Sequence, residues 1–121
     1  MSHRILVTGS RNWTSVSSMR RMLAVARACY PDAVLVHGAC RGADLMAAGI
    51  WTGWGLPTEA HPADWDRHGK AAGPIRNQHM IRLGADACVA FLRPESKGAR
   101  HCADAAERAG IATYRVNHKG T

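Results

Sequence analysis

Glycine and basic residues recur together at four places in this 121-residue chain, and three of these places directly follow a short apolar run. Glycine lets an anionic group approach the backbone closely, and arginine can donate two hydrogen bonds to one phosphate. Where such a segment leads into a helix, free N–H groups and the positive end of the helix dipole also favour an anion. The pattern therefore predicts a phosphate-binding site formed by residues 8–11, 37–44, 73–80 and 93–101.

Arg76 and Asn77 give the strongest of these signals. We expect a helix to begin at Gly73 and Pro74, which places Arg76 and Asn77 in its first turn. A cation there opposes the helix dipole, and a bound anion would remove the conflict. Arg76 is therefore predicted to contact the ligand.

The other three segments also have ordinary structural explanations. Residues 8–11 lack the G-x-G-x-x-G dinucleotide pattern and can form a simple tight turn. Asp44 can accept a hydrogen bond from a ribose hydroxyl, or it can be a favourable acid in a first helical turn. Residues 93–101, with Lys97, Gly98 and Arg100, can form a mobile surface loop. Together the four segments favour a shared site.

Alternating apolar runs and helical patterns predict the elements that position these segments. Near-continuous apolar runs suit parallel strands covered on both faces, and we expect them at residues 5–7, 33–36, 58–61, 87–92 and 111–114. Apolar residues at helical spacing predict helices around residues 16–26, 43–54, 75–83 and 102–109. A long loop is expected at residues 62–74, and long loops are often functional.

This alternation predicts an α/β, Rossmann-like, three-layer doubly wound sheet of five parallel strands in the order 3-2-1-4-5. Ligands of such sheets bind at the carboxyl ends of the strands, beside the switch point, which we expect between the first and fourth strands. Trp13 or Trp65 can stack a base there, or can pack locally. Residues 1–121 have the length of one domain.

The composition favours anionic partners. The net charge is +7, and 13 of the 16 basic residues are arginine, which suits small phosphates or nucleic acid. The four cysteines form no C-x-x-C pair, so we expect reduced thiols and no metal. No signal-like segment and no run of about 20 apolar residues is present, and we expect a cytoplasmic protein without membrane contact.

Five motifs in order resemble the YspA/YpsA-like branch of the SLOG superfamily: TGSRNW, HGACRGAD, HPADW, GPIRNQHM and ADACVAF. This superfamily is related to the Lonely Guy phosphoribohydrolases and to DNA-processing protein A, and the resemblance covers roughly residues 4–116. It implies a Rossmann-like fold that senses or processes nucleotide derivatives. The implied ligand contacts are Gly9, Ser10, Arg11, Gly38, Arg41, Gly42, Asp44, Arg76, Asn77 and Gly98.

One segment departs from the Lonely Guy pattern P-G-G-x-G-T-x-x-E. Pro94 and Gly98 match it, but Ala99 replaces the phosphate-binding threonine and Cys102 replaces the catalytic glutamate. A thiol cannot replace that carboxylate as an acid or as a stabiliser of an oxocarbenium ion. That activity is therefore not expected here.

Three functions follow as hypotheses. The first is binding or sensing of a phosphate-bearing nucleotide derivative, with phosphates held by Arg11, Arg41 and Arg76. The second is hydrolysis of an N-glycosidic or phosphate bond, with acid/base candidates Asp44, Asp64 and Asp66. The third is nucleic-acid binding, as in DNA-processing protein A. We expect the arginines to lower the pKa of Asp44, no cofactor to be needed, and the chain to form a homodimer.

Overall fold

The computed structural model describes residues 2–118 and contains one five-stranded sheet. Its strand order is β3-β2-β1-β4-β5, and every neighbouring pair is parallel. The strands are β1 (Arg4–Gly9), β2 (Val34–His37), β3 (Thr58–Ala60), β4 (Ala87–Leu92) and β5 (Ala112–Asn117). The predicted α/β fold class, the five parallel strands and their order are confirmed.

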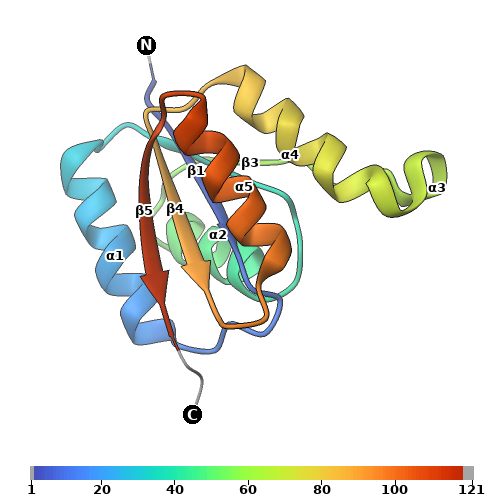
Figure 1. Ribbon diagram of the computed structural model, residues 1–121. Coiled ribbons are helices and arrows are strands. Elements are labelled where there is room, and N and C mark those ends of the chain that lie inside the picture. The colour runs from blue at the N-terminus through green and yellow to red at the C-terminus, as the bar shows by residue number, and fades with distance from the viewer. Residues whose placement is uncertain (1, 119–121) are drawn as a thin grey trace.

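Helices cover both faces of this sheet (Figure 1). They are α1 (Val16–Cys29), α2 (Ala43–Gly53), α3 (Trp65–His68), α4 (Ala72–Leu83) and α5 (Lys97–Arg108). Helices α1 and α2 pack on one face, where Val7 meets Leu23 and Trp51. Helices α4 and α5 pack on the other, where Leu6 meets Met80. Every residue of β4 is buried, because helices cover the sheet on both faces. This cover explains why the sequence of β4 is apolar almost throughout.

The chain leaves β1 towards one face and β4 towards the other, so these neighbouring strands form the switch point. Ser10 N–H donates to the Phe91 carbonyl at 2.9 Å, which holds the two strand ends together. The ends of β1 and β4 therefore stand beside the start of α5, the arrangement in which parallel sheets bind ligands.

The predicted long loop at residues 62–74 is wrong. Helix α3, a 3₁₀ turn (Gly69–Ala71) and α4 follow one another from Trp65 to Leu83. The Asp64 carboxylate caps α3 by accepting from the Arg67 N–H at 3.1 Å, which starts the helical run inside a polar segment. Figure 1 shows α3 and the first part of α4 reaching away from the sheet.

Candidate functional site

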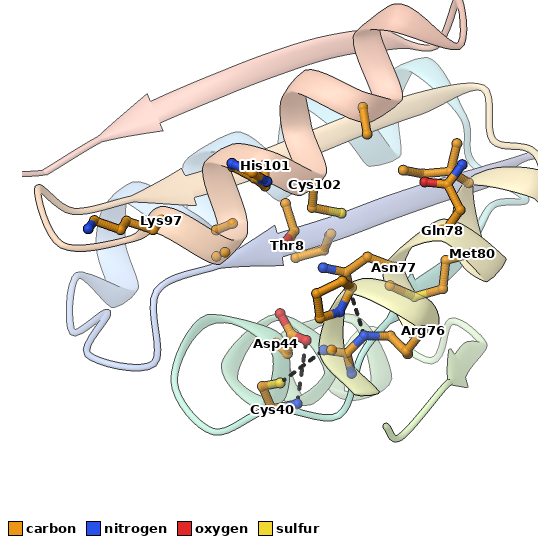
Figure 2. A pocket seen from close by; sticks show the side chains of 18 of the residues that line it. Thr8, Cys40, Asp44, Arg76, Asn77, Gln78, Met80, Lys97, His101 and Cys102 are labelled. Atoms are coloured by element: carbon orange, nitrogen blue, oxygen red, sulfur yellow. Dashed lines mark hydrogen bonds between the residues drawn. The ribbon is translucent and has the colours of Figure 1, made fainter. Parts of the chain in front are cut away.

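A cavity of about 490 Å³ lies between α4 and α5, over the carboxyl end of β1. Figure 2 shows its side chains, which come from β1, the start of α2, α4 and α5. Its volume is within the usual range for small-molecule pockets. The fold thus places a ligand-sized cavity at the predicted switch point.

One end of the cavity is the N-terminus of α5. No hydrogen bond within residues 2–118 uses the N–H groups of Gly98 and Ala99. The N-cap residue Ser96 does not cover them, because its hydroxyl accepts from the Arg93 N–H instead. Lys97 and His101 line the cavity from the same end. Free amides, the helix dipole and a lysine favour an anion there.

The other end of the cavity combines apolar side chains with the polar Gln78 and the basic Arg108. Met80 and Ile81 of α4 face Ala105 of α5 in its lining, and Figure 2 shows Met80 far from Lys97. Thr8 and Cys102 line the middle. Burial raises the pKa of the Cys102 thiol, which a hydrogen bond with Thr8 only partly offsets, so Cys102 stays neutral.

Asp44 is buried in the wall of the cavity, where its carboxylate accepts from the N–H groups of Gly38 at 2.9 Å and Cys40 at 3.4 Å. Burial raises the pKa of Asp44 to about 6, and its hydrogen bonds and the charges of Arg76 and Arg11 only partly oppose this. The predicted lowered pKa is therefore wrong, because desolvation outweighs the arginines. The glycine-rich loop around residues 38–42 directs two amides at the protein's own carboxylate.

Arg76 is the fifth residue of α4, one full turn from the start, because the helix begins at Ala72. The 3₁₀ turn also precedes that start, since the Ala72 N–H bonds to the Gly69 carbonyl. The predicted conflict between Arg76 and the helix dipole is therefore wrong. The Arg76 guanidinium donates to the carbonyls of Gly38 at 2.5 Å and His61 at 3.2 Å.

These bonds tie the ends of β2 and β3 to α4. Arg76 also donates to the Asn77 side-chain oxygen at 2.7 Å, and Figure 2 shows both side chains at the cavity wall. A ligand contact by Arg76 or Asn77 stays a prediction, and Arg76 has a structural role as well.

Gly9, Ser10 and Gly42 form the contact between the end of β1 and the start of α2. A Cβ at Gly9 would press on Ala43 and on the Phe91 carbonyl, and Gly42 has φ +81° against the backbone of residues 10–11. The Ser10 hydroxyl accepts from the Asn12 N–H at 3.0 Å. Packing explains these three residues, although Gly9 also lines the cavity.

The remaining predicted residues divide between cavity and surface. Asp64 and Asp66 are exposed and line neither this cavity nor its neighbour, so the structure does not bring them to the cavity with Asp44. Trp13 is buried against Phe91 in the core, whereas Trp65 is exposed and lines the cavity. Arg41 lines only the neighbouring cavity.

Lys97 and His101 line the cavity and lie in the predicted segment 93–101, but the ten implied ligand contacts do not include them. They stand four residues apart on α5, so both side chains lie on one face of the helix. That spacing, next to Gly98, was a signal available in the sequence.

Comparison with known proteins gives the family. Residues 3–68 match the sequence model of the YspA, cpYpsA-related SLOG family. The chain belongs to this family. The Gene 61 protein of Mycobacterium phage D29 is 42% identical over 96% of this chain and 98% of its own length. No solved structure matches the chain.

Between residues 2 and 118 no helix is long and apolar enough to cross a membrane. Within the same range, no three side chains from His, Cys, Asp and Glu gather to hold a metal ion.

Proposed function

We propose that this SLOG-family protein binds a nucleotide-derived ligand in the cavity between α4 and α5. The phosphate would accept from the N–H groups of Gly98 and Ala99, beside Lys97, and the sugar and base would extend towards Met80 and Ile81. The observation that supports this best is the N-terminus of α5, whose free amides open into a cavity that Met80 and Ile81 line at its far end. Membership of the SLOG family supports a nucleotide-related ligand.

The chemistry of the walls favours binding over turnover. Asp44 is the only carboxylate among the described residues that line the cavity. Cleavage of a glycosidic bond usually uses two carboxyl groups, one as acid and one as base or nucleophile. The buried, neutral thiol of Cys102 cannot supply the second.

Hydrolysis of an N-glycosidic bond remains the second candidate because of Asp44. A carboxyl group with a pKa of about 6 in a cavity can hold a proton near neutral pH and give it to a leaving base. The hydrolase alternative therefore rests on this residue alone.

Calorimetry tests the binding proposal. Four nucleoside 5′-monophosphates, their nucleosides and inorganic phosphate are titrated into the protein. We expect at least one monophosphate to bind, with its nucleoside at least about tenfold weaker, because a charged hydrogen bond contributes roughly 1.5–3 kcal/mol. Equal affinity of nucleoside and nucleotide, or no binding by any monophosphate, would contradict the proposal.

A turnover assay separates the two candidates. The protein is incubated at high concentration with each monophosphate, and the products are separated by chromatography. We expect no free base. Base release that Asp44→Asn abolishes would establish the hydrolase instead, and release that survives Asp44→Asn would point to a contaminating enzyme.

A further inference from the structure

A second cavity, of about 340 Å³, adjoins the first at the carboxyl ends of β2 and β3. The connections that follow these strands form its floor, with residues 38–41 on one side and residues 62–63 on the other. Four residues line both cavities: Arg11, Cys40, Trp65 and Arg76. These side chains therefore form the common boundary of two adjoining cavities.

Three arginines surround the second cavity, and no carboxylate lines it among the described residues. The arginine ion pairs within residues 2–118 belong to Arg4, Arg93 and Arg115. Asp44 acts on Arg11 and Arg76 through space, but it stands in the wall of the first cavity. At most one negative charge thus faces three positive ones.

The three guanidinium groups differ in how firmly they are held. Arg76 is fixed by the carbonyls of Gly38 and His61. Arg11 lies over the Trp65 ring, with 5.9 Å between the guanidinium carbon and the ring centroid. Arg41 is exposed and has no hydrogen bond or ion pair in the described part of the chain. A fixed donor beside two available ones suits an incoming phosphoryl group.

We infer that the second cavity is a phosphoryl-binding subsite, and that the ligand is a nucleotide with two separated phosphoryl groups. One group lies at the N-terminus of α5, and the other lies among Arg11, Arg41 and Arg76. Figure 2 shows the basic end of α5 and the Arg76 side chain on opposite sides of the first cavity. This inference rests on the proposed function and extends it to the class of ligand.

Either a nucleoside bisphosphate or a dinucleotide carries two such groups. In the first the second phosphoryl group is terminal, and in the second it bridges two sugars. Both carry a phosphoryl oxygen that can accept from an arginine fork.

Calorimetry with three probes tests the inference. For the base whose 5′-monophosphate binds best, the monophosphate, the 3′,5′-bisphosphate and the 5′-phosphorylated dinucleotide are compared. We expect one of the last two to bind at least about tenfold more tightly than the monophosphate, and the tighter of them identifies the second group as terminal or bridging. Arg41→Gln should lower the affinity for that larger probe much more than the affinity for the monophosphate, which removes most of the gain.

Arg82→Gln is the matched control, because Arg82 is exposed on α4 and lines neither cavity. It should leave all affinities unchanged. A monophosphate that binds while both larger probes bind no better, or a gain that survives Arg41→Gln, would overturn the second subsite and leave the proposed function standing.

Inorganic phosphate provides a readout that needs no base. Titration followed by NMR should shift the amides of residues 38–41 and the Arg41 Nε–H, and Arg41→Gln should abolish the shift of these amides. If no monophosphate binds, the proposed function fails, and this titration still decides the subsite. Unchanged spectra at these residues would contradict it.

Discussion

Two connections at the same edge of the sheet differ in whether the protein itself already uses their backbone N–H groups as hydrogen-bond donors. Between β2 and α2, the N–H groups of Gly38 and Cys40 donate to Asp44, and the Gly38 carbonyl accepts from Arg76. Between β4 and α5, the N–H groups of Gly98 and Ala99 open into a cavity.

The glycine-rich segment that most resembles an anion cradle is therefore filled by the protein's own carboxylate. The segment that departs from the Lonely Guy pattern keeps its amides available. Glycine content alone does not identify an anion site, because the deciding feature is whether an internal acceptor already uses the amides.

The largest effect expected from this comparison is at Gly42. Gly42→Ala should lower the free energy of unfolding by roughly 2–5 kcal/mol, because φ is +81° and the new Cβ would press on the backbone of residues 10–11. Chemical denaturation followed by circular dichroism measures this loss.

Gly98→Ala is the matched control in the open connection. Nothing lies within 4 Å of a Cβ at Gly98, and alanine is the better helix former, so stability should rise by up to about 1 kcal/mol. Similar losses at both positions would show that the two connections do not differ.

Replacing Arg76 should cause the next largest loss in the free energy of unfolding. Arg76→Ala leaves the carbonyls of Gly38 and His61 without their charged donor, so unfolding should become easier by about 1–3 kcal/mol. Arg82→Ala, on the exposed face of α4, should change stability by less than about 0.5 kcal/mol. Unchanged stability in Arg76→Ala would mean that this arginine acts on the ligand alone.

The raised pKa of Asp44 predicts a smaller effect on stability, and this effect depends on pH. Its pKa is raised from 3.8 to about 6 by burial, so the folded state binds the proton more tightly than the unfolded state. The resulting stability is present at low pH and is lost as pH rises through about 6. Relative to Asp44→Asn, the native protein should lose about 1 kcal/mol between about pH 5 and about pH 7.5.

The comparison with Asp44→Asn isolates this group from its neighbours. Burial lowers the pKa of His37, which acts with the opposite sign in the same range, but His37 is present in both proteins. Parallel stability curves for the two proteins would contradict the raised pKa of Asp44.

The apolar and helical patterns in the sequence predicted the fold well, but the sequence predicted the site only in part. The runs at residues 5–7 and 87–92 are strands because a near-continuous apolar stretch needs cover on both faces. The helical run from Trp65 was missed because its polar composition resembles a loop, and the Asp64 cap acts locally. The pKa of Asp44 was missed because desolvation depends on tertiary packing, whereas the neighbouring arginines are visible in the sequence.

The most direct test of the account is to place a negative charge at Gly98. The helix dipole favours an aspartate in the first turn of α5, and a Cβ at Gly98 meets no atom within 4 Å. Gly98→Asp should therefore keep stability or raise it by about 0.3–1 kcal/mol. The same carboxylate would repel a phosphate at the N-terminus of α5, so the affinity for a nucleoside monophosphate should fall at least about tenfold. Gly98→Asn, which has nearly the same shape and no charge, should bind much more tightly than Gly98→Asp. Equal affinity of the two variants in calorimetry would contradict the claim that this helix end holds the phosphate.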